Sequence, residues 1–294
     1  MAFPDRRYSA RMQRIASGKR TSSDAGTDQL AAWLDARSKV AALTGAGVST
    51  ESGIPDYRDG DGNWKRSPPV QYRDFVASEA VRKRYWARSF AGWPMFAAAR
   101  PGAAHVALAR LERAGRVSQI VTQNVDRLHQ HAGSRSVIDL HGRLDVVRCL
   151  ALDHRFDRDA FQLRLREANP DWDVSRARMA PDGDADLDGI DFGAFNVPAC
   201  EICGGMLKPD VVFYGESVPR ETTAAAFAAV ESADGVLVAG SSLMVWSSFR
   251  LVRAAVARGV EVVAVNRGRT RGDDLFVFKL DRECGAVLAT LSDA

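Results

Sequence analysis

The chain of 294 residues carries a net charge of +3, an apolar content of 46% and four cysteines. The length favours a large core domain with a smaller inserted module. The mild positive charge indicates no specific nucleic-acid partner, and no apolar run is long enough to predict a membrane span. Without an apolar signal-peptide core, four cysteines favour metal binding or free thiols over disulfides.

The first 27 residues are rich in Arg and Ser and show no hydrophobic periodicity, so we predict a disordered basic segment for residues 1–27. A flexible terminus of a cytoplasmic protein and a mitochondrial transit peptide both fit this composition, and we prefer the first. The mitochondrial matrix is therefore the alternative compartment. A helix is predicted to begin at Asp28, with Thr27 as its N-cap.

A short apolar run that ends at Leu43 predicts a buried strand, and Gly45-Ala46-Gly47 follows it. Two glycines let the backbone turn sharply and approach a ligand closely. The small polar residues after them are in position to start a helix whose free N–H groups face a pyrophosphate. However, Thr50 stands where a dinucleotide-binding fingerprint has its third glycine, so a plain tight turn fits this stretch equally well.

The residues after this turn favour a loop that folds over a ligand, because they combine a turn former, an apolar residue, an acid, an aromatic and a base. They are Gly53, Ile54, Pro55, Asp56, Tyr57 and Arg58. Residues 59–69 are predicted to form a polar loop, and residues 74–99 are predicted to be helical. A further helix is predicted over residues 103–114, ending at Gly115.

Four further strands are predicted over residues 117–122, 137–140, 236–239 and 260–265. Helical connections near them predict an α/β fold with a doubly wound, Rossmann-like parallel sheet. Small or polar groups follow each strand, at the edge of the sheet where ligands bind in such folds. These groups include Gln123, Asn124, Asp126, His141, Gly240, Ser241, Ser242, Asn266, Arg267 and Gly268.

Residues 145–206 interrupt this rhythm and contain three of the four cysteines. We predict that they form a small cysteine-containing module, with residues 28–144 and 207–294 forming the Rossmann-like domain. A helical part of the small domain is predicted within residues 60–100. The acidic stretch at 181–189 has the Asp spacing of an EF-hand loop, but Phe195 stands where calcium needs a bidentate Glu. A solvated acidic loop is therefore favoured.

Several blocks together resemble the sirtuins, which are NAD-dependent protein-lysine deacylases. The blocks occur in family order between about residues 28 and 290, and they are Gly45–Ser49 with Gly53–Arg58, Thr122–Asp126, His141-Gly142, the split cysteines, Lys208–Glu216 and Gly240–Ser242. The Pro-Asp-Tyr-Arg form at 55–58 and the segment Arg84-Tyr85-Trp86-Ala87-Arg88 are most similar to the class II branch. That branch includes the mitochondrial sirtuin with lipoamidase and acidic-deacylase activities.

Among the five histidines, His141 is the best-placed general base, because it follows a strand and precedes a glycine at the ligand edge. The resemblance implies that the acyl oxygen of the substrate lysine displaces nicotinamide from NAD, and that His141 accepts a proton from a ribose hydroxyl. The acyl group then passes to the 2′-OH. Asn124 would order the ribose or a water, and an alternative for the Asn124–Asp126 pair is a helix N-cap.

The resemblance also implies where NAD binds. Ile54 and Asp126 would line the nicotinamide pocket, and Cys284 would lie near the adenine without a catalytic role. The implied cofactor-binding residues are Gly45, Ala46, Gly47, Ser49, Glu51, Gly53, Ile54, Pro55, Asp56, Tyr57, Arg58, Gln123, Asn124, Asp126, Gly240, Ser241, Ser242, Asn266, Arg267, Gly268 and Cys284.

The cysteines depart from the family pattern, which has two Cys-x-x-Cys pairs around a tetrahedral zinc ion. Cys200 and Cys203 supply one pair, but Leu152 stands where a thiolate should follow Cys149. Asp153 or His154 could complete the site, and His is the better zinc ligand. Loss of the metal is the other interpretation.

The substrates implied by the resemblance are acyl-lysine proteins, bound by a monomer. The peptide is expected to add a strand between residues 212–216, with Val212, Phe213, Gly215 and Glu216, and the loop that contains Val245. Tyr85 and Arg88 have the Tyr-x-x-Arg spacing with which acidic-acyl sirtuins hold a carboxylate, and side chains three apart share a helix face. We therefore expect acidic or branched acyl groups; a core aromatic beside a solvated Arg is the alternative.

Three other functions use parts of the same pattern. A non-enzymatic NAD sensor needs the glycine turn but has no use for His141 beside Asn124 and Asp126. A dehydrogenase is disfavoured by the displaced third glycine and the same polar cluster. Protein mono-ADP-ribosylation also begins with loss of nicotinamide, and the sequence does not separate it from deacylation.

Overall fold

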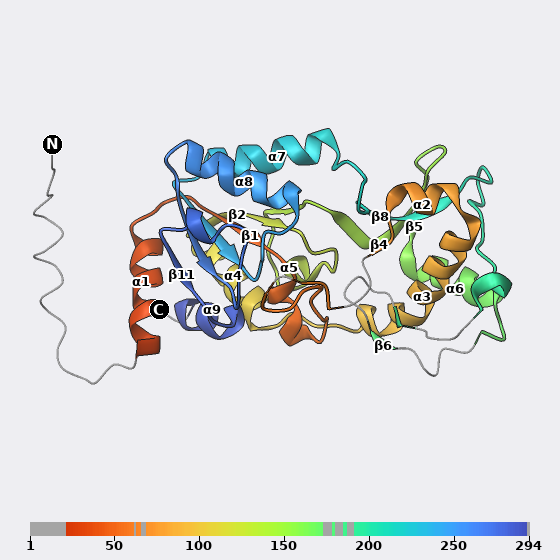
Figure 1. Ribbon diagram of the computed structural model, residues 1–294, viewed down its shortest axis with the longest axis horizontal. Coiled ribbons are helices and arrows are strands. Elements are labelled where there is room, and N and C mark those ends of the chain that lie inside the picture. Colours follow the sequence, from red (N-terminus) through yellow and green to blue (C-terminus); the bar gives the residue numbers. More distant parts are fainter. Residues whose placement is uncertain are drawn as a thin grey trace, which may run out of the picture.

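The computed structural model describes residues 22–61, 63–65, 69–172, 178–179, 185–186 and 191–292. They form two unequal parts, a large parallel sheet between two layers of helices and a smaller part built on a three-stranded antiparallel sheet (Figure 1). Of residues 1–27, which were predicted to be disordered, residues 1–21 lie outside the described residues, and so does most of the acidic stretch at 181–189.

The large sheet has six parallel strands in the order β11-β10-β9-β1-β2-β3. Their bounds are β1 Val40–Thr44, β2 Val117–Thr122, β3 Val137–Asp139, β9 Gly235–Ala239, β10 Glu261–Val265 and β11 Phe278–Leu280. The strand order reverses between β1 and β9, and this switch point is where open α/β sheets bind ligands. The doubly wound sheet is therefore confirmed, with β11 as a strand that the sequence did not indicate.

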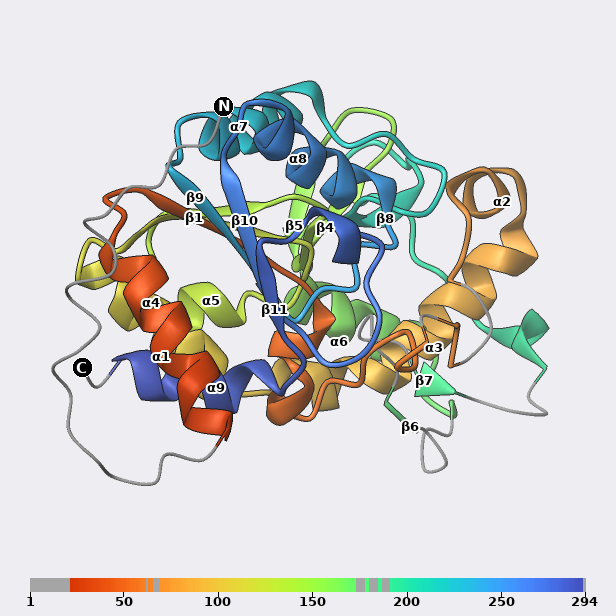
Figure 2. The same cartoon turned by 60° about the vertical axis from the view of Figure 1, so that its left-hand side comes forward.

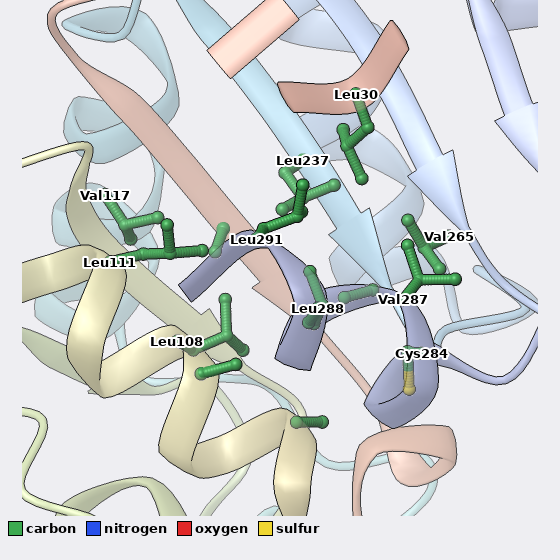
Figure 3. Close-up of a cluster of buried hydrophobic side chains, with 14 of the residues drawn as sticks. Leu30, Leu108, Leu111, Val117, Leu237, Val265, Cys284, Val287, Leu288 and Leu291 are labelled. Carbon is green, nitrogen blue, oxygen red and sulfur yellow. The ribbon is translucent and has the colours of Figure 1, made fainter. Parts of the chain in front are cut away.

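Helices cover both faces of this sheet because its strands are apolar on both sides. The first face packs on α1 Ser22–Asp35, α4 Ala103–Arg113 and α9 Cys284–Ser292, whereas the second packs on α7 Arg220–Glu231 and α8 Trp246–Ala257 (Figure 2). Within β1, Ala42 faces the first layer and Leu43 the second, as the two-residue period of a strand requires. Figure 3 shows side chains from α1, α4 and α9 meeting over the strands, with Leu30, Leu108 and Leu288 among them.

The first helix begins earlier than the sequence predicted. Helix α1 begins at Ser22, so Thr27 lies inside the helix and is not its N-cap. A Cβ atom on Gly26 would lie 2.9 Å from the side chain of Leu280 in β11. The early turns of α1 thus pack on the edge strand, and this tertiary contact supports helix where composition alone indicated disorder.

The smaller part is built on the sheet β5-β4-β8, with strands β4 Gly142–Cys149, β5 Arg155–Asp157 and β8 Leu207–Val211. It carries α2 Tyr72–Ala77, α3 Glu79–Ala97, α6 Arg158–Ala168 and the short strands β6 Arg178–Met179 and β7 Ala185–Asp186. An aromatic core joins these elements, with Phe75 from α2, Trp86 from α3 and Phe161 from α6 fully buried together.

Two details of this part differ from the sequence prediction. The helical stretch at 74–99 is divided, because Ser78 is extended and its side chain accepts a hydrogen bond from the backbone N–H of Val81 at the start of α3. In addition, β8 pairs with β4 in the small sheet, although the segment from residue 207 onward was assigned to the Rossmann-like domain. Among the described residues, no helix is both long and apolar enough to cross a membrane.

The remaining short elements are the 3-10 helices η1 Ala46–Val48, η2 Thr50–Ser52, η3 Phe192–Ala194 and η4 Asp273–Leu275, together with α5 Leu128–His131.

Candidate active site

A cavity of about 1390 Å³ lies between the carboxyl edge of the large sheet and the smaller part. Its wall takes residues from the ends of β1, β2, β9 and β10, from the segment after β8 and from α3. A single small-molecule site usually occupies about 300–1,000 Å³, so this space can hold two ligands side by side.

The turn after β1 is packed backbone to backbone against the turn after β9. The N–H of Gly47 donates to the carbonyl oxygen of Gly240 at 2.8 Å, and a Cβ atom on Gly47 would lie 2.8 Å from the Gly240 Cα atom. Only glycine permits this approach. The chain then forms η1 and η2, two short 3-10 turns, in place of the expected helix start. Both turns line the cavity, so they form a cradle of backbone and small side chains that suits a pyrophosphate.

A hydrogen-bonded network joins this turn to the end of β2. The Ser49 hydroxyl donates to Asp126 Oδ2 at 2.6 Å, and Asn124 Nδ2 donates to Ser49 Oγ at 2.9 Å and to the Gly45 carbonyl oxygen at 3.0 Å. Asp126 Oδ1 also accepts from the backbone N–H of Leu128 at 2.9 Å, which holds the start of α5. The network fixes an amide and a carboxylate at the cavity wall.

Two buried histidines lie beneath this network, and the sequence analysis assigned neither of them. His105 Nε2 lies 3.4 Å from Ser49 Oγ, and His129 Nε2 lies 2.9 Å from the Thr44 hydroxyl. Their rings meet edge to face at 4.8 Å. Burial lowers the pKa of both rings, so they are uncharged at neutral pH and support the wall without adding charge.

His141 lies in the link between the two sheets, two residues after the end of β3 and directly before β4. Its Nδ1 is 3.2 Å from the Gln123 carbonyl oxygen, and its Nε2 is 2.7 Å from Ser247 Oγ. A carbonyl oxygen only accepts, so Nδ1 carries the proton and the lone pair of Nε2 accepts from the Ser247 hydroxyl. Burial lowers the pKa of His141 to about 4, and the ring is neutral at pH 7.

The segment that follows β8 is held on the wall by a buried ion pair. Lys208, which is 1% exposed, donates from Nζ to Glu216 Oε2 at 3.0 Å. The same carboxylate oxygen accepts from the backbone N–H of Phe213 at 2.9 Å. The backbone N–H of Val212 donates to the carbonyl oxygen of His141 at 2.8 Å, which links this segment to the candidate base.

Most of the residues expected from the sequence line this one cavity, including His141, Asn124, Asp126, Tyr85, Cys284 and Val245. Of the expected cofactor- and substrate-binding residues, four do not: Glu51, Gly53, Gly268 and Arg88. Glu51 faces α9, since a Cβ atom on Gly285 would lie 2.1 Å from its carboxylate. Gly53 and Gly268 occupy left-handed turns, with φ of 83° and 77°.

The expected pair of Tyr85 and Arg88 is not assembled at the cavity. Tyr85 lines it, but Arg88 Nε donates to the Ala185 carbonyl oxygen in β7 at 2.9 Å. Side chains three apart share a face of α3, yet the arginine extends along that face to the neighbouring strand. Within the described residues, the Arg88 guanidinium thus contacts β7 instead of lining the cavity beside Tyr85.

The cysteine module brings four metal-binding side chains together. The ligand atoms of Cys149, His154, Cys200 and Cys203 all lie within 4.8 Å of one another. Asp153 has φ of 55°, and this left-handed turn after β4 directs His154 to the cluster, while Leu152 is 66% exposed. Tetrahedral zinc with sulfur ligands at about 2.3 Å requires sulfurs roughly 3.8 Å apart, so three thiols and one imidazole at these separations fit such an ion.

Ser247 and Lys208 contact the candidate site, although the sequence analysis assigned no role to either. Ser247 is separated from His141 by 106 residues, and no local pattern marks such a pair. Lys208 belongs to the Lys208–Glu216 block on which the family resemblance partly rests. Its burial beside Glu216, however, depends on how β8 packs, and the sequence does not show that packing.

Comparison with known proteins identifies relatives over most of the chain. Residues 45–247 match the family described as "Sir2 family". The "NAD-dependent protein deacetylase" of Bordetella bronchiseptica is 56% identical over 260 residues, covering 88% of this chain and 95% of the relative. The Drosophila melanogaster "NAD-dependent protein deacylase Sirt4" is 48% identical over 264 residues, covering 89% of this chain and 85% of the relative.

Solved structures agree with this match. The structure described as "Sir2-p53 peptide-NAD+" aligns with a TM-score of 0.74 and 28% identity, over 91% of this chain and 97% of that one. The structure "Sir2 bound to acetylated peptide" aligns with a TM-score of 0.72 and 26% identity, over 91% and 97%. With the cavity, its glycine turns and its histidine in place, these matches lead to one conclusion: the chain belongs to the Sir2 family.

Proposed function

We propose that this protein is an NAD-dependent protein-lysine deacylase that transfers the acyl group to the ribose 2′-OH and releases nicotinamide. The observation that carries the proposal is the neutral His141, whose basic Nε2 lies in the same cavity as the two glycine turns. The relatives named as NAD-dependent deacetylases and deacylases support the same activity.

The residues of the chain divide the work. NAD, when bound, supplies the ribose carbon that the acyl oxygen attacks as nicotinamide leaves. The turns at Gly45–Gly47 and Gly240–Ser242 hold the pyrophosphate, and Asn124 and Asp126 hold the polar groups near the ribose and the carboxamide. His141 Nε2 accepts the proton of a ribose hydroxyl, which takes the place of Ser247 as its donor.

The acyl-lysine enters from the side of the smaller part. The peptide backbone adds a strand between residues 212–216 and residues 244–246, where main-chain pairing gives affinity with little sequence demand. The wall beneath includes apolar side chains, among them Ile54, Phe96, Leu144 and Phe213. Because Arg88 does not line the cavity, we propose that the preferred acyl groups are branched or otherwise uncharged.

Mass spectrometry of products from an acyl-lysine peptide panel with NAD tests this function. The expected products are free lysine peptide, nicotinamide and O-acyl-ADP-ribose, with branched apolar acyl groups preferred over a carboxylate-bearing one. His141→Tyr is expected to abolish deacylation without changing the urea unfolding midpoint. Transfer of ADP-ribose to a protein with no deacylated peptide would instead favour the ADP-ribosyltransferase reaction, and turnover without nicotinamide release would contradict both.

We also propose that Cys149, His154, Cys200 and Cys203 bind one structural zinc ion, with His154 in place of the missing fourth thiolate. Metal analysis of protein purified without chelators is expected to give about one zinc per chain. His154→Ala should lower that ratio and the thermal unfolding midpoint, and His154→Cys should restore both. The exposed His131, replaced by Ala, is the matched control. Equal zinc content in His154→Ala and wild type would exclude His154 as a ligand.

A further inference from the structure

The cavity wall includes two arginines, on α7 and α8, that the reaction itself does not use. Arg220 is the first residue of α7, and Arg250 lies in the second turn of α8. The two helices run side by side over the same face of the large sheet (Figure 1). Arg220 closely follows residues 212–216, and α8 begins at Trp246. The arginines therefore flank the lane proposed for the substrate peptide, whereas the pyrophosphate turns follow β1 and β9.

Contacts between α7 and α8 hold the Arg250 guanidinium in place. Its Nη2 donates to the Thr223 hydroxyl at 3.2 Å, and its Cζ lies 5.3 Å from the centre of the Phe227 ring. Thr223 is three residues after Arg220, so these two side chains share one face of α7. Both arginines and Thr223 line the cavity. Arg220 and Arg250 thus add two positive charges to the cavity wall, and contacts with α7 already order Arg250 before any ligand binds. We call these two residues the cationic surface.

This cationic surface has no anionic partner within the described part of the chain. Three acidic side chains on the cavity wall pair with other cations: Asp56 with Lys65, Glu216 with Lys208 and Glu283 with Arg267. Asp126 accepts hydrogen bonds from the Ser49 hydroxyl and the Leu128 N–H, and Asp59 accepts from backbone N–H groups of its own loop. Neither Arg220 nor Arg250 forms an ion pair with a described residue. Arg250 Nε is also buried without a hydrogen-bond acceptor. A buried donor without an acceptor is unfavourable, so the described residues do not fully satisfy the Arg250 guanidinium.

We propose that Arg220 and Arg250 bind an anionic side chain of the substrate protein, close to the acyl-lysine along the extended peptide. This inference rests on the proposed deacylase function. The matching groups are the carboxylate of Asp or Glu and the phosphate of phosphoserine, since both present oxygens that a planar guanidinium binds with two parallel hydrogen bonds. Substrate choice is then set by charge beside the lysine, in addition to the backbone pairing.

Binding and turnover of matched peptides test the proposal on the full-length protein. Fluorescent acyl-lysine peptides carry Glu, phosphoserine, Gln or Lys at single positions on either side of the acyl-lysine. At one or more of these positions, wild type should prefer Glu over Lys by about fivefold in Kd and in kcat/KM, a size typical of a partly exposed ion pair. Tighter binding of the phosphoserine peptide than of the Glu peptide would identify phosphate as the better ligand.

Arg220→Gln/Arg250→Gln should reduce the ratio between the Glu and Lys peptides to about one, and Arg250→Glu should reverse it. Arg258→Gln, at the exposed carboxyl end of the same helix, controls for loss of general positive charge and should keep the wild-type ratio. Equal ratios in wild type and the double variant, or no charge preference in wild type, would overturn the proposal. The absence of nicotinamide release from every peptide would instead refute the deacylase function, and the binding ratios would still be measured.

Discussion

The buried pair of Lys208 and Glu216 gives the sharpest test of how the substrate side of the cavity is held. The Lys208 side chain is 2% exposed and that of Glu216 is 15% exposed, so neither charge is well solvated. Glu216→Gln keeps the shape and an acceptor for the Phe213 N–H but removes the counter-charge. Burial already lowers the pKa of Lys208, and Glu216 opposes that shift, so the variant leaves an ammonium with little compensation.

Loss of one partner from a buried ion pair typically costs about 3–5 kcal/mol. We expect Glu216→Gln to lower the free energy of unfolding by about 2–3 kcal/mol at pH 7. The loss is smaller than usual because Lys208 keeps the carbonyl oxygens of Pro209 and Val211 as acceptors and can lose its proton. In the variant the unfolded chain binds this proton more tightly than the folded chain. Stability of Glu216→Gln should therefore rise with pH toward the unfolded lysine pKa near 10.4, relative to wild type.

Urea unfolding at pH 7 and pH 9.5 measures both effects. Lys208→Met/Glu216→Gln, which buries no charge, should recover to within about 1 kcal/mol of wild type. The matched control is Glu79→Gln on α3, which removes an exposed carboxylate paired with the partly buried Lys83, and we expect it to cost less than about 0.5 kcal/mol of stability. If Glu216→Gln costs no more than Glu79→Gln, or if the double variant is no more stable than the single one, the assigned role of the buried charges is wrong.

Three further predictions concern the catalytic side. Because the pKa of His141 is lowered to about 4, kcat/KM for NAD should stay level from neutral pH to about pH 5 and fall below it; a fall centred near pH 6.5 would contradict the neutral buried ring. Gly142→Ala places a Cβ atom 2.1 Å from the Asp210 carbonyl oxygen, so turnover should fall at least about tenfold. The control is Gly115→Ala, which is also at positive φ but has no atom within 4 Å of the new Cβ. It should cost only about 1 kcal/mol of stability through backbone strain. Ser247→Ala removes the donor to Nε2 and should raise the His141 pKa in an NMR titration, and Ser247→Thr should not; equal pKa values would exclude the hydrogen bond.

The sequence predicted the central strands well for a physical reason. Strands buried on both faces are continuous apolar runs, and β1, β2, β9 and β10 all lie inside the sheet. The edge strand β11 was not predicted, because its three residues include Lys279 and are only partly buried, so they form no continuous apolar run. The pairing of β4 with β8 joins residues about 60 positions apart, and no local periodicity encodes such a contact.

For the candidate site too, features set by parallel strand topology could be predicted from the sequence, whereas contacts that depend on side-chain direction could not. Residues directly after parallel strands were predicted correctly to meet at one edge, because parallel topology brings strand ends together. The three-residue spacing on α3 predicted that Tyr85 and Arg88 share a helix face. It does not determine the direction of the long arginine side chain, which contacts Ala185 in β7. The choice between Asp153 and His154 also stayed open, since it depends on a left-handed turn at Asp153 that brings the imidazole to the thiols.

Strand β4 connects the two candidate centres of the molecule. Gly142 at its beginning follows His141, and Cys149 at its end belongs to the metal cluster, about 24 Å away along the strand. The same strand pairs with β8, from Leu207 beside the cluster to Val211 beside the substrate segment. A metal ion that holds Cys149 near Cys200 and Cys203 would thus fix one end of the paired strands β4 and β8. The candidate base His141 and the proposed peptide-binding segment lie at the other end of the same two strands. Loss of the ion should disturb peptide binding and His141 geometry, while the pyrophosphate turns on β1 and β9, which share no strand with the cluster, should still bind ADP-ribose.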